Sequence, residues 1–250
     1  KIMDLESAIS KLGADKIGAF IAEPILSSGG VIVPAAGYQK RTWEICHEND
    51  ILYISDEVVT GFGRLGHWFA SEAVFDFVPD IITCAKGLTS GYLPLGACII
   101  SDRVMEALSQ GKEPSAFTNG YTYSGHPVSC VAALKNIEII ENEKILENVR
   151  NVTPYFQKRL KELMKYDIVG DARGMGLLGC IECQADDLEA ERSLGSKVDE
   201  ACEELGLIVR PLINMAVFSP PLIITLKQID EMFDILEAAL LKVQNELKLN

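Results

Sequence analysis

The sequence predicts an α/β fold in which a largely parallel sheet is followed by a smaller α+β domain. In the first half, buried-strand patterns alternate with helical patterns, which is the order expected for parallel strands joined by crossover helices. In the second half, short strand patterns stand among long helical ones. Nearly half of the 250 residues are hydrophobic (48%), so the chain can bury a substantial core.

The first half contains four predicted strands and one clear helix. Compact apolar runs predict strands at 17–22, 51–55 and 81–85, and residues 38–48 have helical spacing. A fourth strand is predicted at 95–100. It begins only nine residues beyond Lys86, and a parallel crossover needs about a dozen residues or more. We therefore expect this strand to run antiparallel to the preceding one.

The second half begins with a long helical region. Apolar residues recur at helical spacing from 127 to 165, where Pro154 is expected near a helix start or at a kink. Further elements are predicted as strands near 168–169, 177–181 and 207–209 and as helices at 196–204 and 228–248. We place a domain boundary near Glu143, between an incomplete large domain (1–142) and a small C-terminal domain (143–250).

Charge and composition exclude several classes of protein. Twenty-three Lys and Arg against 36 Asp and Glu give a net charge of −13, which opposes binding to nucleic acid. No apolar run reaches the length of a membrane-spanning helix. The seven cysteines are scattered, which predicts small buried side chains in a reducing, cytoplasmic compartment. Cys180 and Cys183 have metal-ligand spacing, but no second pair completes a site, so we expect no metal.

Charged residues follow three of the predicted strands. Glu23, Asp56 and Lys86 each stand at a strand's carboxyl end, and in open α/β sheets ligands bind at that edge. Each residue alone is an ordinary surface charge. Together they predict a site with two acids and one amine, in which a lysine partly withdrawn from water can form a Schiff base. Pyridoxal phosphate chemistry needs such a lysine and an acid beside it.

A long composite pattern supports this interpretation. The segment LYISDEVVTGFGR at 52–64, followed by DIITCAK at 80–86, resembles the class III aminotransferases, which are fold-type I pyridoxal phosphate enzymes. Similarity to this family continues at 22–34 and, in its C-terminal domain, at 206–210 and 219–222. The segments 91–97 and 121–127 are similar to its ω-amino-acid:pyruvate branch. The resemblance implies transfer of an amino group from an amine or ω-amino acid to a keto acid such as pyruvate. The family's N-terminal portion is not in the sequence, and the opening at Lys1 suggests part of a longer chain.

The resemblance also implies roles for five residues. Lys86 matches the Schiff-base lysine that moves protons, and Asp56 the carboxylate that pairs with the pyridinium nitrogen. Val58 matches the residue packed on the cofactor ring. Thr122 matches the residue that reaches the cofactor phosphate of the neighbouring subunit, which implies a homodimer or larger assembly. Arg210 matches the arginine that binds the substrate carboxylate, for which its planar fork is suited.

One position departs from the pattern of ornithine- and 4-aminobutyrate-type relatives. There, a glutamate in the loop after Glu-Pro can neutralise the substrate-binding arginine. Aligning Glu23-Pro24 places Ser28 at that position. Without a carboxylate there, Arg210 must swing away when the amine carries no nearby carboxylate. This favours an amine or ω-amino acid as donor and pyruvate as acceptor.

Three other interpretations can be weighed against this one. A dinucleotide-dependent oxidoreductase is suggested by G-x-G-x-x-G at Gly61–Gly66 and Gly174–Gly179, but no helix is predicted to open from either loop and Asp56-Glu57 would repel a pyrophosphate. A Schiff-base aldolase leaves Asp56, Thr122 and Arg210 without roles. A non-catalytic interaction protein that keeps only the scaffold is the alternative from another class. It would show no cofactor absorbance.

Overall fold

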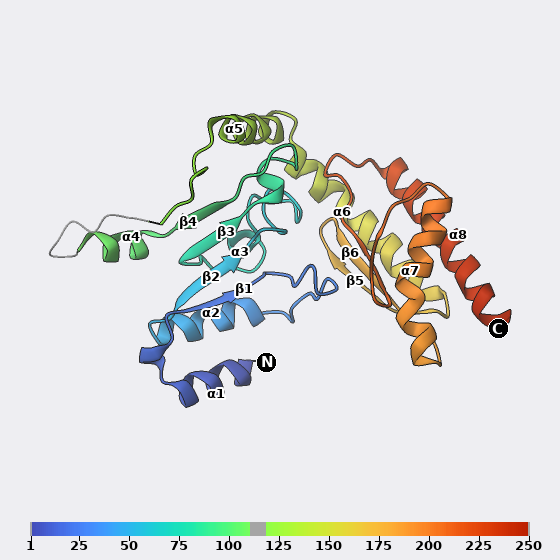
Figure 1. Ribbon diagram of the computed structural model, residues 1–250, viewed down its shortest axis with the longest axis horizontal. Coiled ribbons are helices and arrows are strands. Elements are labelled where there is room, and N and C mark those ends of the chain that lie inside the picture. Colours follow the sequence, from blue (N-terminus) through green and yellow to red (C-terminus); the bar gives the residue numbers. More distant parts are fainter. Residues whose placement is uncertain (1, 111–118, 250) are drawn as a thin grey trace. The chain divides into compact units, whose positions relative to one another are not determined.

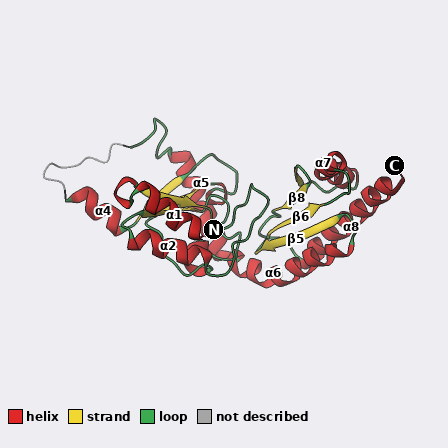
Figure 2. Cartoon of the chain, turned by 90° about the horizontal axis from the view of Figure 1, so that it is seen from below, coloured by secondary structure: helices red, strands yellow, loops and turns green. Residues whose placement is uncertain are grey.

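The computed structural model describes residues 2–110 and 119–249, whose helices and strands are shown in Figure 1 and Figure 2. By their contacts, these residues form two compact units. The first comprises the described residues of 1–24, 34–63 and 67–144, and the second those of 25–33, 64–66 and 145–250. Two short segments from the first half of the sequence thus belong to the second unit.

The first unit contains a four-stranded sheet in the order β1-β2-β3-β4 (Figure 1). The strands are β1 (Ala19–Ala22), β2 (Leu52–Asp56), β3 (Ile81–Cys84) and β4 (Ala97–Ile100). The first three are parallel, and β4 pairs antiparallel with β3, with Cys84 opposite Ala97. The predicted direction of all four strands is confirmed, because the short connection after Lys86 turns the chain back beside β3.

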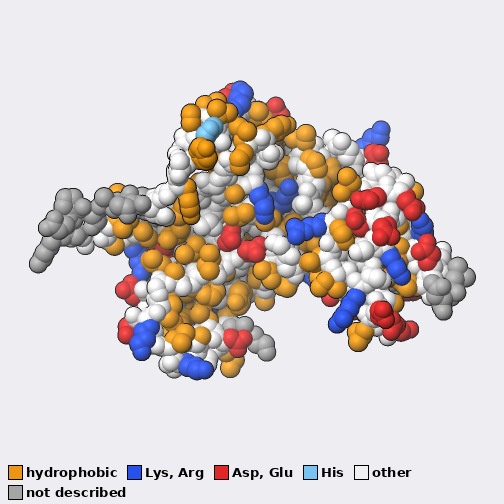
Figure 3. All heavy atoms as spheres, in the orientation of Figure 1, with side chains coloured by type: hydrophobic (Ala, Val, Ile, Leu, Met, Phe, Trp, Pro, Cys, Tyr) orange, Lys and Arg blue, Asp and Glu red, His pale blue; other side chains and the backbone are white. Residues whose placement is uncertain are grey.

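Helices precede, join and follow these strands. They are α1 (Ile2–Leu12), α2 (Tyr38–Glu48), α3 (Ala70–Ala73), α4 (Asp102–Ser109) and α5 (Pro127–Asn142), with 3-10 turns at Ala14–Lys16 and Lys86–Leu88. The predicted bounds of α2 are confirmed, since its apolar side packs Ile45 and Cys46 against Tyr53 of β2. Other apolar side chains of this unit stay exposed, among them Ile21 of β1, Ile99 of β4 and Val131 of α5. Figure 3 shows many hydrophobic side chains on the visible face of the chain.

The second unit contains an antiparallel sheet in the order β5-β6-β8-β7. Its strands are β5 (Val169–Met175), β6 (Leu178–Cys183), β7 (Arg210–Leu212) and β8 (Met215–Phe218). The strand predicted at 207–209 is wrong: it begins at Arg210, and Ile208 is 84% exposed. Strand β8 was not predicted from the sequence. A tight turn with Ile213 at φ 56° joins β7 to β8, so pairing across this hairpin sets the strand bounds rather than the apolar run before it.

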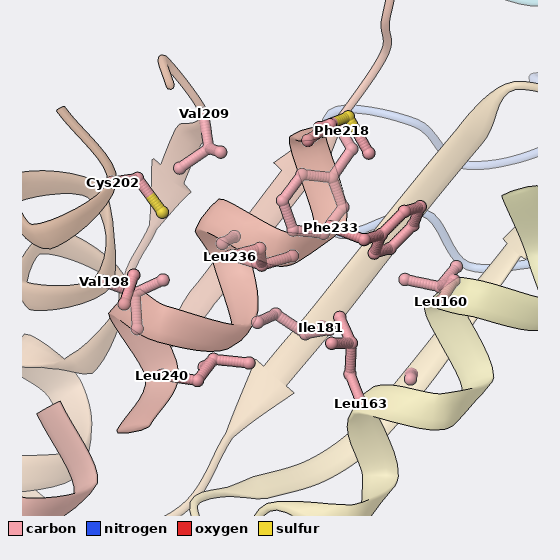
Figure 4. Close-up of a cluster of buried hydrophobic side chains, with 14 of the residues drawn as sticks. Leu160, Leu163, Ile181, Val198, Cys202, Val209, Phe218, Phe233, Leu236 and Leu240 are labelled. Atoms are coloured by element: carbon pink, nitrogen blue, oxygen red, sulfur yellow. The ribbon is translucent and has the colours of Figure 1, made fainter. Parts of the chain in front are cut away.

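Three long helices cover this sheet. They are α6 (Ile145–Glu162), α7 (Leu188–Glu204) and α8 (Leu226–Leu249), and a 3-10 turn at Leu163–Lys165 follows α6. Pro154 lies inside α6. Buried side chains from all three helices form one core with the strands, and Figure 4 shows Leu160, Ile181, Val198 and Phe233 in it. In the described part of the chain, no helix combines the length and apolar character needed to cross a bilayer.

Candidate active site

The three charged residues predicted at strand ends lie on one edge of the first sheet. Ala22 is opposite Ser55, so Glu23 follows β1 where Asp56 ends β2. Asp56 is in turn opposite Thr83, and Lys86 stands two residues beyond the end of β3. Because these strands are parallel, the two acids and the amine meet at the carboxyl edge of the sheet.

Lys86 occupies a strained backbone conformation. Its φ is 37°, in the left-handed region that costs a non-glycine residue about 1–3 kcal/mol. The turn that it opens is held from α5, where Asn136 Nδ2 donates to the carbonyls of Gly87 (2.9 Å) and Leu88 (3.1 Å). The Lys86 side chain is exposed. The other residues of this chain therefore do not give it the partial burial that the sequence suggested.

Asp56 is fixed by its own turn. The backbone N–H of Val58 donates to Asp56 Oδ1 at 3.1 Å, which is the hydrogen bond of an Asx turn. Asp56 and Val58 are both half-buried. The residue predicted to pair with a ring nitrogen and the one predicted to pack on that ring therefore share a single constrained turn.

Glu57, between them, is fully buried, and the sequence analysis assigned it no role. Its carboxylate accepts hydrogen bonds from the backbone N–H groups of Ala70 and Ser71, both at 2.8 Å. The hydroxyls of Ser71 (2.5 Å) and Thr60 (2.8 Å) donate to it as well. The sequence signal was an acid next to an apolar strand with Ser and Thr downstream, which is too common to single it out.

Gln39 is a second residue that the sequence analysis missed. Its side chain is buried, and Nε2 donates to the carbonyls of Glu23 and Pro24 at 2.9 Å each. The Tyr53 hydroxyl donates to Gln39 Oε1 at 2.7 Å. Helix α2 thereby fixes the chain where it leaves β1, at the position of Glu23.

Thr122 lies in an exposed turn that leads into α5. Tyr121 N–H donates to Ser124 Oγ at 2.9 Å, and Ser124 N–H donates to the Tyr121 carbonyl at the same distance. Tyr121 and Tyr123, which flank Thr122, are 84% and 81% exposed. In the described chain this turn presents its side chains to the surface.

Arg210 belongs to the second unit, where it begins β7 and is exposed. Arg173, Cys180, Val217 and Arg210 are directly opposite one another across the four strands. Residues paired in this way point to the same face, and the alternate row, with Ala172, Ile181 and Ala216, is in the helix-covered core. Arg210 and Arg173 therefore lie on the other face, about 14 Å apart at the usual strand spacing.

The loop that carries Ser28 packs on this same face. It is a small hairpin closed by a bridge between Leu26 and Ile32, and Ser28 is exposed near its tip. Arg173 Nε donates to the Gly30 carbonyl at 2.8 Å. Asp171 (2.8 Å) and Glu182 (2.6 Å) hold the Arg173 guanidinium by ion pairs. Ser28 and Arg210 are thus carried on one face of the second unit.

Neither glycine motif opens a helix. Gly61–Gly66 lies in a loop in which Phe62 N–H donates to the Trp68 carbonyl at 2.7 Å. The second motif forms the hairpin between β5 and β6, with Gly174 opposite Gly179. The dinucleotide-binding fingerprint needs a glycine loop that leads directly into a helix. That interpretation is therefore wrong.

Arg64, within the first motif, has a structural role. It donates to the carbonyls of Leu177 (2.9 Å) and Pro220 (2.6 Å), and burial lowers the pKa of its guanidinium to about 10. Burial likewise raises the pKa of the Cys180 and Cys183 thiols, to about 11 and 12. Among the described residues no group of three or more His, Cys, Asp or Glu could hold a metal ion.

Comparisons with known proteins agree on one family. Residues 2–240 match the family described as Aminotransferase class-III. The putrescine–pyruvate aminotransferase of Pseudomonas aeruginosa is 45% identical over 91% of this chain. The chain spans about half the length of the curated relatives it matches, 50% for this one.

Solved structures give the same result. An omega-transferase from Vibrio fluvialis JS17 is 40% identical, with a TM-score of 0.93 over 100% of this chain and 61% of its own. An amine transaminase from an uncultivated Pseudomonas species, solved in its PLP-bound form, is also 40% identical. Its TM-score is 0.91, over 97% of this chain and 56% of its own. At 40% identity, these structures resemble the chain in sequence as well as in fold.

Proposed function

The chain belongs to the class-III aminotransferases, and on this premise we propose that the full-length protein moves an amino group from an amine or ω-amino acid to a keto acid such as pyruvate. Members of this family depend on pyridoxal phosphate. The observation that carries the proposal is the strand register, which brings the Asp56 carboxylate and the Lys86 turn to neighbouring strand ends.

The residues at this edge fit the cofactor chemically. A primary amine and a carboxylate are the two groups that its aldehyde and its ring nitrogen require, and Lys86 and Asp56 supply them from adjacent strands. When bound, pyridoxal phosphate supplies a carbonyl carbon that amines can attach to and a ring that withdraws electrons. We assign Lys86 Nζ to attach the cofactor covalently and to move the proton at the reacting carbon.

The remaining residues of this turn orient the group. The Asp56 carboxylate holds the proton on the ring nitrogen by its negative charge, and the Val58 N–H bond to Oδ1 limits its rotation. The Val58 side chain packs on the ring. Thr122 binds the phosphate group in a neighbouring copy of the chain, which makes the active protein at least a homodimer; its exposed turn supports this role.

Specificity is assigned to the second unit. The Arg210 guanidinium binds the carboxylate of the keto acid, for which two parallel N–H donors are suited. The exposure of Arg210 at the start of an edge strand leaves its side chain room to turn away when an amine without a carboxylate binds. Ser28, on the same face, offers no carboxylate to hold it. The putrescine–pyruvate relative uses, by its name, such a pair of substrates.

Reduction of the full-length protein with borohydride tests this proposal. We expect a visible band at about 410–430 nm before reduction, and peptide mapping should then find the cofactor adduct on Lys86. Lys86→Ala should give neither. Asp56→Asn should keep the adduct while turnover falls about a hundredfold or more, since a neutral amide cannot stabilise a protonated ring.

Other outcomes would count against the assignment. An adduct on a different lysine would remove Lys86 from the site. A full-length protein without a visible band and without an adduct would favour a non-catalytic protein that keeps only the scaffold.

A further inference from the structure

Glu57 combines complete burial with a full set of hydrogen-bond donors. A buried carboxylate is costly unless its oxygens are satisfied, and here each oxygen accepts from one backbone N–H and one hydroxyl. Oε1 accepts from both donors of Ser71, and Oε2 accepts from Ala70 N–H and Thr60 Oγ1. All four donors are neutral. The carboxylate is therefore held in place by hydrogen bonds to both of its oxygens rather than by an ion pair.

The backbone of Glu57 connects the two strand ends of the site. Its N–H donates to the Thr83 carbonyl at 2.9 Å, one residue beyond the last pairing of β2 with β3. Its carbonyl accepts from Gly61 N–H at 3.0 Å. On the Asp56 side, Glu57 lies within the Asx turn that fixes the Asp56 carboxylate.

The loop that follows Glu57 and contains Gly61 and Phe62 also contacts the Lys86 turn. A Cβ added at Gly87 would lie 2.9 Å from Phe62 Cβ and 3.3 Å from the Gly61 carbonyl, so the Gly61-Phe62 backbone packs directly against Gly87. A shift of this loop would displace the residue next to Lys86. Because Glu57 ties the start of the loop to α3, it constrains Asp56 directly and Lys86 through Phe62 and Gly87.

We propose that Glu57 is a positioning residue for the cofactor site, whose buried carboxylate sets the placement of Asp56 against the ring nitrogen and of the Lys86 turn beside it. This role rests on the proposed function. It does not require Glu57 to touch the cofactor. It requires that a substitution of the Glu57 carboxylate change the electronic state of the bound cofactor.

The test substitution is Glu57→Gln. A glutamine has nearly the same size, but one of its two terminal positions is an NH2 group, which only donates. Each carboxylate oxygen of Glu57 faces a backbone N–H, so the amide must point a donor at a donor in either orientation. The loop must then shift. Ser71→Ala is a milder variant that removes a single hydroxyl donor and keeps the charge.

Asp80→Asn provides the matched control. Asp80 is also a buried acid of this sheet, but it precedes β3, at the strand end opposite to Lys86. It accepts from Tyr53 N–H at 2.8 Å and from Arg103 at 3.1 Å. Asp80→Asn should lower the melting temperature without changing the absorbance of the bound cofactor.

The measurement is a pH titration of the visible band in the full-length protein loaded with pyridoxal phosphate, alongside thermal melting. We expect Glu57→Gln to move the titration midpoint by about half a pH unit or more, in the direction found for Asp56→Asn. Ser71→Ala should move it less, in the same direction, and Asp80→Asn should leave it unchanged while still lowering the melting temperature.

The outcomes separate the two proposals. A wild-type protein without a visible band overturns the proposed function and this role with it. A normal wild-type band whose midpoint is unmoved in Glu57→Gln overturns the positioning role alone, and so does an equal shift in Asp80→Asn. If Glu57→Gln does not fold, an unmoved midpoint in Ser71→Ala has the same consequence.

Discussion

Two adjacent carboxylates at the end of β2 differ in what surrounds them. Glu57 is fully buried and bonded to backbone and hydroxyl donors, whereas Asp56 is half-buried and accepts from its own turn through Oδ1. Strand geometry explains the difference, because successive side chains point to opposite faces. The Glu57 side chain is thereby directed towards α3, and the Asp56 side chain towards the opposite face of the sheet. Their assigned roles, positioning and charge stabilisation, follow from these surroundings.

At the residue scale, we predict that Arg210→Ala separates the two half-reactions. Pyruvate carries a carboxylate beside its reacting carbonyl and should lose about 1.5–3 kcal/mol of binding, the usual contribution of a charge-assisted hydrogen-bonded pair. A diamine has no carboxylate and should react almost as before. Single-turnover spectroscopy of the full-length protein follows each half separately. Equal loss in both halves would mean that Arg210 supports the fold or the cofactor.

Ser28→Glu is the complementary variant. A carboxylate on this exposed hairpin should compete for Arg210 and weaken pyruvate binding while leaving the diamine half-reaction intact. Because Ser28 is exposed, the substitution should cost little stability. Unchanged pyruvate kinetics would show that the hairpin does not reach the arginine.

At the scale of elements, the β5–β6 hairpin holds a segment from the first half of the sequence. Leu177 N–H donates to the Arg64 carbonyl at 3.0 Å, and the Arg64 side chain donates back to the Leu177 carbonyl. Gly176, at φ 61°, sits where a Cβ would lie 2.5 Å from the Arg64 carbonyl oxygen. The second glycine motif therefore serves a close backbone approach.

We predict that Gly176→Ala lowers the free energy of unfolding more than Gly206→Ala does. Both glycines have positive φ, so both alanines are strained by about 1 kcal/mol or more. Only at Gly176 does the added methyl meet backbone atoms, while nothing lies within 4 Å at Gly206. The total at Gly176 should reach about 2–4 kcal/mol. Urea unfolding of the two variants measures the difference, and equal losses would contradict the close approach.

For the whole molecule, each unit has a core of its own. The core of the second unit joins α6, α7 and α8 to the sheet and includes the thiols of Cys183 and Cys202, of which Figure 4 labels Cys202. Burial raises the pKa of both thiols to about 12, because the thiolate is disfavoured away from water. Cys183 and Cys202 act as small apolar side chains at neutral pH, as predicted, whereas Cys98 is exposed and does not follow that prediction.

We predict that alkaline pH destabilises this core through its thiols. Their pKa is higher in the folded than in the unfolded chain, so the folded state is not penalised below about pH 9 and loses stability as pH rises towards 12. By pH 10 the loss should be about 1 kcal/mol per thiol. A Cys183→Ala/Cys202→Ala variant should be less stable at pH 8 but lose less between pH 8 and pH 10. Parallel losses in urea unfolding would contradict this.

The sequence by itself determined the elements whose signals are local. Helix α2 followed from its apolar spacing, the three parallel strands from their apolar runs, and the reversal of β4 from the short connection after Lys86. It also placed Glu23, Asp56 and Lys86 at one sheet edge, because the carboxyl ends of parallel strands must meet there. The roles predicted for Asp56, Val58 and Lys86 came from the resemblance of a long motif that is contiguous in the chain.

Only the tertiary structure decided the features that depend on distant partners. The bounds of β7 and the existence of β8 came from pairing across a hairpin, which an apolar run at 207–209 did not reveal. The burial of Glu57 depends on donors at Ala70 and Ser71, and Gln39 acts through Tyr53 and the end of β1. Hydrogen bonds between residues far apart in the chain leave no periodic signal. Their energy comes from burial, which exists only once the chain has folded.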